Sequence, residues 1–264
     1  MIDIHAHILP GFDDGARTFA EAAEMACQAL EDGITEIVAT PHVLDPDRTP
    51  RERIITAALA LQDKLDADGI AVRIRPGAEN HIRPDLPLLV REEKVMTLCD
   101  AGRYLLLELP LRELPLYTEQ VVFDLLTLGV TPIIAHPERQ CELARDPRKL
   151  EALVRRGCLA QISTGSVRGR FGREARRAAE IMLARGLAHV LATDGHGADR
   201  RRIAMAEAGE RVAGLFGDEF AAQLTAAGPE AIVRGRALEC RAPASRARTA
   251  RWFWHMAKEA AGLR

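Results

Sequence analysis

Short apolar runs alternate along the chain with longer segments in which apolar residues recur every three or four positions. The short runs predict strands and the longer segments predict amphipathic helices. The predicted strands are 2–8, 34–39, 70–75, 104–109, 131–135, 159–163 and 189–193. The predicted helices extend from a Thr18–Glu21 capping box to Gly33, from Thr49-Pro50 to about Gly69, and over 117–128, 147–156, 172–185 and 200–215. About seven such units indicate an α/β fold with a closed or nearly closed barrel of parallel strands.

The composition fits one folded domain with a short appendage. The chain has 264 residues, 47% of them apolar, and a formal net charge of −2. This balance gives no basic excess for nucleic-acid binding. No run approaches the ~18 consecutive apolar residues of a membrane-spanning helix. The chain begins without the pattern of a secretory signal, and its five cysteines are scattered, so we expect a cytoplasmic protein with reduced thiols.

The last part of the chain has a different character. We expect the barrel over residues 1–239 and a basic, aromatic tail over 240–264, in which basic side chains surround Trp252-Phe253-Trp254. One interpretation is a terminal helix that packs its aromatic side chains on the barrel. The other is a docking tail for an acidic partner or a membrane surface, which would give peripheral membrane association.

Histidine and acidic side chains occur repeatedly where predicted strands end. His5 and His7 close the first strand two positions apart, which directs both side chains to the same side of an extended chain. Glu108 ends an apolar strand, where an unpaired carboxylate is costly to bury. The residues that share this position at carboxyl ends are His5, His7, His42, Glu79, Glu108, His136, Asp194 and His196.

In parallel barrels the active site lies at this rim. Imidazole and carboxylate are ligands for Zn²⁺, Mn²⁺ or Fe²⁺, and five histidines with three acids exceed what one ion can use. We therefore predict two or three divalent ions with bridging carboxylates. Taken singly, a His-x-His pair or Asp194-Gly-His196 would be ordinary in a surface strand or a turn, but eight such residues at one rim favour a metal site. His81, His189 and His255 fall outside the pattern and are interpreted as ordinary surface or core residues.

Arginines near the same rim suggest an anionic ligand. Guanidinium groups form the bidentate hydrogen bonds that a phosphoryl group accepts. Arg139 follows His136, Arg201 follows Asp194, and the glycine-rich segment 163–172 contains two more arginines. We expect this segment to offer free backbone N–H groups ahead of a helix. The predicted phosphate-handling arginines are Arg139 and Arg201, with Arg168 and Arg170 as substrate-binding candidates, and the alternative for each is a solvated surface charge.

These motifs, in this order, resemble the polymerase and histidinol phosphatase (PHP) superfamily, and within it the bacterial capsular and exopolysaccharide branch of manganese-dependent tyrosine-protein phosphatases. The segment Met1–Gly15, with its Leu-Pro-Gly-x-Asp-Asp-Gly continuation, is the most specific match. The other matching segments are 39–42, 76–79, 107–110, 135–139, 161–166, 169–172 and 193–196, within about residues 1–235.

The resemblance implies a distorted (β/α)7 TIM-like barrel with three metal ions at the carboxyl ends of its strands. Mn²⁺ is the expected ion, with Fe²⁺, Zn²⁺ and Co²⁺ as alternatives. Arg139 and Arg201 correspond to phosphate-orienting arginines, and Asp14 to a ligand or proton carrier. The implied ligand sets are His5, His7 and Asp194 for one ion; Glu79, Glu108 and His136 for a second, with Glu79 bridging; and His42 and His196 for a third.

The resemblance also implies an activity, the hydrolysis of phosphotyrosine on a protein. The implied partner is a bacterial tyrosine kinase with a tyrosine-rich tail in capsule or exopolysaccharide synthesis. A small-molecule phosphatase acting on a metabolite such as histidinol phosphate is one alternative, and a non-catalytic PHP-type regulatory protein is another. Cys27, Cys141 and Cys158 do not begin the Cys-x5-Arg loop of the cysteine-dependent phosphatases, because Gly33, Pro147 and Thr164 stand where that loop needs arginine. It departs from the family pattern at Gly197, where Asn is usual, and at Arg200–Ile203, where the usual run is Gly-Arg-Pro-Pro.

Overall fold

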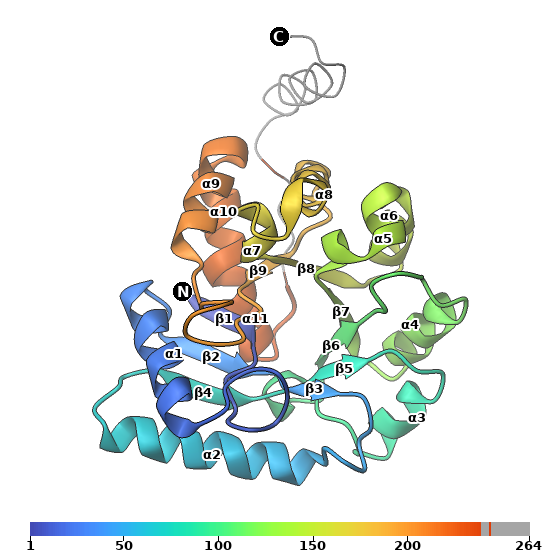
Figure 1. Cartoon of the computed structure of the whole chain (residues 1–264). Helices are drawn as coiled ribbons and strands as arrows, with labels where there is room; N and C mark the ends of the chain where they lie inside the picture. The colour runs from blue at the N-terminus through green and yellow to red at the C-terminus, as the bar shows by residue number, and fades with distance from the viewer. Residues whose placement is uncertain (239–242, 244–264) are drawn as a thin grey trace.

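A computed structural model describes residues 1–238 and 243 of the chain, and the prediction for the tail lies outside these residues. Helices surround a central layer of strands, and every strand pairing among the described residues is parallel (Figure 1). The strands are β1 (Ile2–Ala6), β2 (Glu36–Ala39), β3 (His42–Val43), β4 (Arg73–Pro76), β5 (Glu79–His81), β6 (Tyr104–Glu108), β7 (Thr131–Ala135), β8 (Leu159–Ser163) and β9 (Val190–Ala192).

The helices cover the outside of the strands, with α2 along one end of the molecule and α5, α6 and α8 beside β7 and β8 (Figure 1). The α-helices are α1 (Phe19–Glu31), α2 (Arg51–Ala67), α3 (Leu86–Arg91), α4 (Thr118–Thr127), α5 (Cys141–Arg145), α6 (Pro147–Arg155), α7 (Thr164–Val167), α8 (Gly172–Ala184), α9 (Ala206–Phe216), α10 (Asp218–Ala222) and α11 (Gly228–Val233). Short 3₁₀ turns η1 (Leu98–Asp100) and η2 (Pro137–Arg139) and a π-helical turn η3 (Gln223–Ala227) complete the described elements. No helix of the described chain is sufficiently long and apolar to cross a membrane.

Two parallel sheets are joined into a ring. Their strand orders are β1-β2-β4 and β3-β5-β6-β7-β8-β9. Two residues separate β2 from β3 and β4 from β5, so each of these pairs acts as one strand that bends from the first sheet into the second. The other junction is a parallel bridge between Ala6 and Gly195, where the His7 amide donates to the Gly195 carbonyl at 2.8 Å. Seven strand positions therefore run around a distorted barrel, as the sequence predicts.

The start of α1 shows how local sequence sets an element. The Thr18 side chain accepts a hydrogen bond from the Glu21 amide at 3.2 Å, and Glu21 accepts one from the Arg17 amide at 3.0 Å. The Thr18 cap satisfies an amide that the first helical turn leaves free, and Glu21 satisfies the amide of the residue before the cap. The helix ends before Gly33, whose φ of +84° is easily reached only without a side chain. The Thr18 half of the predicted capping box and the predicted end are confirmed, whereas Glu21 bonds the Arg17 amide and not the Thr18 amide.

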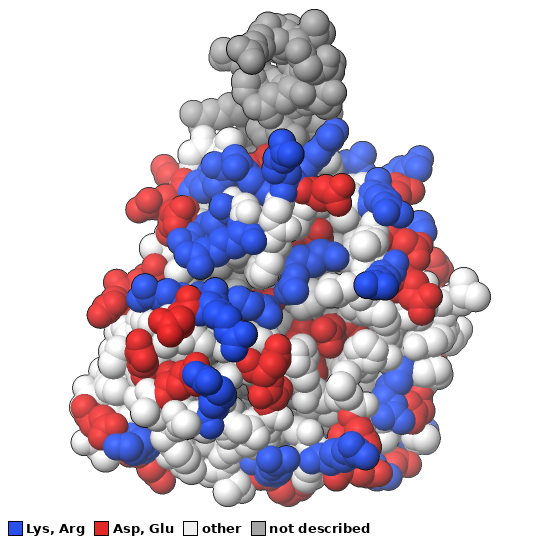
Figure 2. Space-filling view, viewed as in Figure 1, with Lys and Arg blue, Asp and Glu red and all other residues white. Residues whose placement is uncertain are grey.

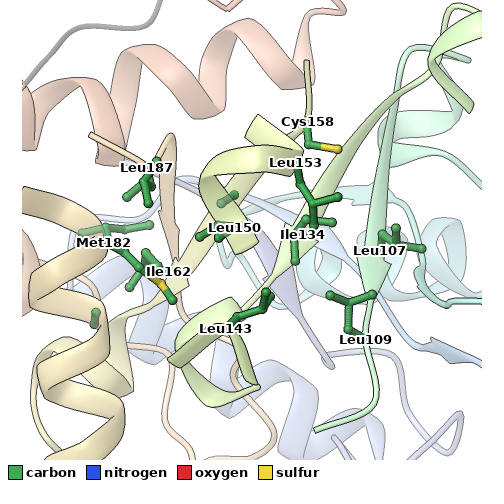
Figure 3. Close-up of a cluster of buried hydrophobic side chains, with 14 of the residues drawn as sticks. Leu107, Leu109, Ile134, Leu143, Leu150, Leu153, Cys158, Ile162, Met182 and Leu187 are labelled. Atoms are coloured by element: carbon green, nitrogen blue, oxygen red, sulfur yellow. The ribbon is translucent and has the colours of Figure 1, made fainter. Parts of the chain in front are cut away.

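The largest packed layer lies between strands β6 to β8 and the helices outside them. Leu107, Ile134 and Ile162 extend from consecutive strands toward Leu150 of α6 and Met182 of α8 (Figure 3). All five side chains are fully buried. Burial of each such side chain contributes roughly 1.5–3 kcal/mol. This apolar layer fixes β6 to β8 from outside and leaves their carboxyl ends free to present polar groups.

Three predictions about elements need correction. The helix predicted from residue 200 begins at Ala206, because Asp32 accepts hydrogen bonds from the Met205 and Ala206 amides and caps it there. The glycine-rich segment 163–172 is not open. It contains α7, and the amides of the turn that follows donate to carbonyls within the segment, including Arg170 to Gly165 at 2.8 Å. The predicted free N–H groups are therefore already used. The short strands β3 and β5 were not predicted at all.

His189 offers a test of core electrostatics away from the rim. Its ring Nδ1 accepts the Ala160 amide at 3.0 Å, and burial lowers the pKa of the ring to about 4. Because the pKa of His189 is lower in the folded than in the unfolded protein, its contribution to the unfolding free energy is complete above the unfolded pKa near 6.5. This contribution is lost as pH falls toward 4. The expected contribution is roughly 3 kcal/mol. In His189→Asn, whose amide oxygen can accept the same bond, we expect this part of the pH dependence to disappear.

The measurement is urea unfolding of both proteins at several pH values between 7 and 4. The difference between parent and variant isolates His189, because all other titrating groups are shared. Equal slopes of unfolding free energy against pH would contradict the assignment.

Candidate metal centre

The structure brings all eight predicted ligand candidates together at one end of the strands. His5 ends β1 and His7 follows it, His42 begins β3, and Glu79 begins β5. The remaining four end or follow β6, β7 and β9: Glu108, His136, Asp194 and His196. His136 and Asp194 have left-handed backbones, with φ of 31° and 53°. Such conformations are uncommon outside glycine and often occur at functional sites.

Glu79 lies at the centre of this cluster. Its Oε2 lies 3.3 Å from both His5 Nε2 and His7 Nε2 and 2.9 Å from His42 Nδ1. Its Oε1 lies 2.9 Å from His136 Nε2. Four imidazole rings from three parts of the chain therefore surround one fully buried carboxylate.

Asp194 is the second shared carboxylate. Its Oδ1 lies 3.5 Å from His5 Nε2 and from His7 Nε2 and 3.4 Å from His196 Nδ1. Its Oδ2 accepts hydrogen bonds from Arg139, at 2.6 Å, and from Arg201. One carboxylate thus connects the histidines with two arginines.

Ligand atoms close enough to share an ion fall into four overlapping groups among the described residues. The groups are His5, His7 and Asp194; His7, Asp14, His42 and His196; His5, Glu79 and His136; and His42, Glu79 and Glu108. The first group matches an expected ligand set, and the second contains another. The expected set of Glu79, Glu108 and His136 is divided, because Glu108 lies on the His42 side of Glu79 and His136 on the His5 side. Glu79 still belongs to two groups, as a bridging ligand would.

Two further observations indicate that these residues fit divalent cations. Glu79 Oε2 and His42 Nδ1 are buried atoms with no hydrogen bond to the described residues, although they lie only 2.9 Å apart. The ring nitrogens His5 Nε2 and His7 Nε2 face one another at 3.2 Å. Buried polar atoms without a partner are costly, and a cation would satisfy all of them. The oxygen and nitrogen donor set suits Mn²⁺, Fe²⁺, Co²⁺ or Zn²⁺.

The carboxylates of the cluster are held in the ionised form that a cation requires. Burial would raise the pKa of Glu79, but the charge of His5 and hydrogen bonds with other histidines keep it well below its ordinary value. Burial also opposes ionisation of Asp194, and the charge of His5 and a hydrogen bond from His7 keep that pKa well below its ordinary value. Hydrogen bonds from histidines outweigh burial at Glu108 and lower its pKa to about 2. These strongly shifted groups lie together at one rim, which is typical of functional sites.

Two side chains that hold the ligands in place were missed by the sequence analysis. Asp13 accepts from His7 Nδ1 at 2.7 Å and from the His42 amide at 3.0 Å. Gln161 Oε1 accepts from His5 Nδ1 at 3.0 Å. The contacts with the His7 and His5 rings hold Nε2 of each toward the centre, the usual support of a metal-bound histidine, and the contact with the His42 amide fixes the backbone there. Their sequence signals were an Asp13-Asp14 pair and a glutamine in an apolar strand.

Asp14 and His81 lie at the edge of the cluster. Asp14 is exposed, and its Oδ1 lies 3.4 Å from His196 Nε2 and 3.7 Å from His42 Nε2. His81 Nδ1 lies 3.4 Å from Glu108 Oε2. His81, interpreted from the sequence as an ordinary residue, thus contacts a candidate ligand but belongs to none of the four groups.

The four predicted arginines divide into two pairs. Arg139 and Arg201 both contact Asp194, and their guanidinium carbons lie 4.3 and 5.5 Å from the centre of the Phe171 ring. Such stacking orients a guanidinium group without using its hydrogen-bond donors. Arg168 instead forms an ion pair with Glu207, and Arg170 is exposed. These two line a pocket beside Arg201 rather than the cluster itself.

The fold and this site define a class of protein: a parallel α/β barrel with a cluster of histidines and carboxylates that suits divalent ions, flanked by arginines. The CpsB/CapC family of capsular polysaccharide synthesis matches residues 1–234. The chain belongs to this family.

Two curated relatives support the assignment. The tyrosine-protein phosphatase YwqE of Bacillus subtilis is 35% identical over 226 residues, which cover 85% of this chain and 89% of the relative. The tyrosine-protein phosphatase CpsB of Streptococcus pneumoniae is 30% identical over 241 residues, which cover 88% of this chain and 98% of the relative. The resemblance found in the sequence is thereby confirmed.

Solved structures agree at the level of the fold. A structure from work on YwqE from Bacillus subtilis and CpsB from Streptococcus pneumoniae, described as unique metal-dependent tyrosine phosphatases, has a TM-score of 0.88 at 34% identity and covers 92% of this chain and 98% of that chain. A beta-aspartyl dipeptidase from Fervidobacterium islandicum has a TM-score of 0.53 at 13% identity, covering 92% and 76%. The second likeness shows a shared fold only.

Divalent ions should stabilise the folded chain if the cluster binds them. We expect Mn²⁺, added to chelator-treated protein at about 100 times its dissociation constant, to raise the unfolding free energy by about 2.7 kcal/mol for each independent site. That corresponds to an increase of several degrees in Tm. In Glu79→Gln the increase should be much smaller, because Glu79 belongs to two of the four groups.

Differential scanning calorimetry with and without Mn²⁺ measures this effect. Glu24→Gln, on the exposed face of α1, is the matched control and should behave as the parent. A Tm that does not respond to Mn²⁺, Zn²⁺, Fe²⁺ or Co²⁺ would exclude the cluster as a metal centre.

Proposed function

We propose that the protein is a metal-dependent phosphomonoesterase that hydrolyses phosphotyrosine on proteins. The observation that carries this proposal is Asp194, a candidate metal ligand that also holds Arg139 and Arg201 at the edge of the cluster. Cations and guanidinium groups on one side of a pocket suit a dianionic phosphoryl group. The curated relatives, both named tyrosine-protein phosphatases, support the same activity.

The cluster would hold two or three divalent ions through the eight candidate ligands. Bound divalent ions would offset the negative charge on the phosphoryl oxygens. They would also lower the pKa of water so that it becomes a nucleophile near neutral pH. We propose Mn²⁺ as the ion used by this chain. Glu79 would serve two ions, because it belongs to two of the four groups, and Asp194 would serve one ion together with His5 and His7.

The protein's own groups would position the phosphate and the leaving group. Arg139 and Arg201, held by Asp194 and Phe171, would donate hydrogen bonds to phosphoryl oxygens and offset charge that develops in the transition state. Asp14 is an exposed carboxyl beside His42 and His196, and it would hold the proton that the departing tyrosyl oxygen takes up.

Cysteine chemistry has no support in the described residues. Burial raises the pKa of the Cys158 thiol to about 12, and that of Cys99 also to about 12. Thiols with such values are poor nucleophiles near neutral pH. Neither residue takes part in the histidine and carboxylate cluster.

The biological setting follows from the family. We propose that the substrate is a phosphotyrosine-bearing bacterial tyrosine kinase in capsule or exopolysaccharide synthesis, and that the protein acts in the cytoplasm. We further propose that residues 1–239 form the catalytic barrel. The matched segment, residues 1–234, contains every candidate ligand.

The activity is tested with phosphotyrosine peptides and p-nitrophenyl phosphate. We expect turnover with Mn²⁺ and none after complete chelation. In His136→Ala we expect kcat/KM to fall by roughly 10- to 100-fold or more, because a ligand beside Glu79 is lost. Cys27→Ser, an exposed thiol on α1, is the control and should retain activity.

Three outcomes would contradict the proposal: activity that survives chelation, a His136→Ala protein as fast as the parent, or a higher kcat/KM for histidinol phosphate than for phosphotyrosine. The last would favour a small-molecule phosphatase with the same centre. Complete inactivity with every ion would favour a regulatory protein.

The role of Asp14 has its own signature. Tyrosyl oxygen is a strong base that needs a proton on leaving, whereas p-nitrophenolate is a much weaker base. In Asp14→Asn we therefore expect kcat on a phosphotyrosine peptide to fall by about 100-fold and kcat on p-nitrophenyl phosphate to fall far less. Steady-state kinetics on both substrates measure the ratio, with the exposed Asp63→Asn on α2 as control. An equal loss on both substrates would assign Asp14 to metal binding instead.

A further inference from the structure

A pocket of about 150 Å³ lies beside the metal centre, between the segment that ends α7 and the loop that follows β9. We call it the arginine pocket. Its lining includes Thr164, Gly165, Phe171 and Thr193 together with five arginines: Arg168, Arg170, Arg200, Arg201 and Arg202. Figure 2 shows basic side chains gathered on the face of the molecule over this region. Such a density of guanidinium groups around a small hollow is an unusual feature for a chain with a net charge of −2.

Most of the positive charge in the pocket is not neutralised by the protein. Arg168 is paired with Glu207 and Arg201 with Asp194. Arg170, Arg200 and Arg202 are exposed and form no ion pair with the described residues. Like charges held close together repel one another, and an anion between them would remove that repulsion.

The pocket shares a wall with the metal centre. Phe171 lines it and also stacks against Arg139, and Arg201 lines it while contacting Asp194. The Phe171 ring packs closely against Gly165. A Cβ added at Gly165 would lie only 2.6 Å from Phe171 Cε2, so the ring has no room to move toward that residue. An anion in the pocket would therefore lie next to a phosphoryl group held by Arg139 and Arg201.

Three of the arginines are consecutive in one loop. Arg200 and Arg202 flank Arg201, so three guanidinium groups follow one another along this segment. The loop that carries them is closed by a hydrogen bond from the His196 amide to the Arg201 carbonyl at 2.9 Å. The added charge is thereby presented at the edge of the metal centre and not on a remote surface.

We propose that the arginine pocket binds a second anionic side chain of the same substrate, within a few residues of the phosphotyrosine. This inference rests on the proposed phosphatase function and adds a determinant of substrate choice to it. The group recognised is a carboxylate or a second phosphate, since both accept hydrogen bonds from paired guanidinium groups. The phosphotyrosine itself is held by the metal centre with Arg139 and Arg201, and the second anion by Arg170, Arg200 and Arg202.

The experiment uses the full chain loaded with Mn²⁺ and a panel of phosphotyrosine peptides. Members of the panel carry Glu, Gln or phosphoserine at one position, from three residues before to three residues after the phosphotyrosine. At the best position we expect kcat/KM to be about fivefold higher for Glu than for Gln, through KM, as for an exposed charge pair. A larger gain with phosphoserine than with Glu would identify a second phosphate as the preferred anion, and the reverse would identify a carboxylate.

The variant Arg200→Gln/Arg202→Gln should reduce the preference for Glu over Gln to within about twofold. The control variant Arg73→Gln/Arg91→Gln removes the same charge from exposed positions on β4 and α3 and should keep the preference. Circular dichroism and Tm establish that both variants fold.

Three results overturn the inference, and they separate its failure from that of the proposed function. If all peptides are hydrolysed with the same kcat/KM, or if the control variant loses the preference equally, the pocket has no such role and the phosphatase function stands. If no phosphotyrosine peptide is hydrolysed with any ion, the proposed function fails and the inference fails with it.

Discussion

The structure of the site depends on one constraint, which is that a fully buried carboxylate must be compensated. Glu79 has no access to water, and four histidines lie within 3.3 Å of its two oxygens. Without those rings the ionised group would be costly by several kcal/mol. The histidine nitrogens that face Glu79 also lie close to one another, and His5 Nε2 is 3.2 Å from His7 Nε2. A cation between them would satisfy the oxygens and the nitrogens at once, so the burial of this carboxylate suits the binding of divalent ions.

The bends in the barrel follow from this constraint. Had β2 and β4 continued straight, His42 and Glu79 would belong to the same sheet as β1. Instead, β3 pairs with β5 in the second sheet, with His42 opposite Glu79 in the register. The first sheet ends and the second begins where the ligands are needed. On the other side of the ring, the bridge between Ala6 and Gly195 joins the segment carrying His5 and His7 to the segment carrying Asp194.

The sequence predicted those parts of the molecule that depend on local pattern. The alternation of strands and helices follows from hydrophobic periodicity, and the eight rim residues follow from their place at strand ends. The supporting residues Asp13 and Gln161 were missed because their role exists only across the fold, between segments far apart in the chain. The start of α9 was missed for the same reason, since Asp32, more than 170 residues earlier, caps it. The division of Glu108 and His136 between two groups depends on how the strands bend, which periodicity does not encode.

The segment after β9 carries both candidate metal ligands and the arginines proposed to bind substrate. Asp194 and His196 are fixed by backbone contacts, with the Asp194 amide donating to the His5 carbonyl at 2.8 Å, so they have little freedom to vary. The His196 amide is in turn bonded to the Arg201 carbonyl at 2.9 Å, which closes the loop formed by residues 197–200. A Cβ at Gly197 would lie 3.2 Å from Glu21 Oε1, and Glu21 is held by Arg17 at the start of α1. A side chain at this position would meet the mobile end of Glu21, so glycine lets the loop approach α1 without displacing that carboxylate. Arg201 contacts Asp194, whereas Arg200 and Arg202 are exposed and form no ion pair with the described residues, so the charge at positions 200 and 202 can change without the loss of a contact to a candidate ligand.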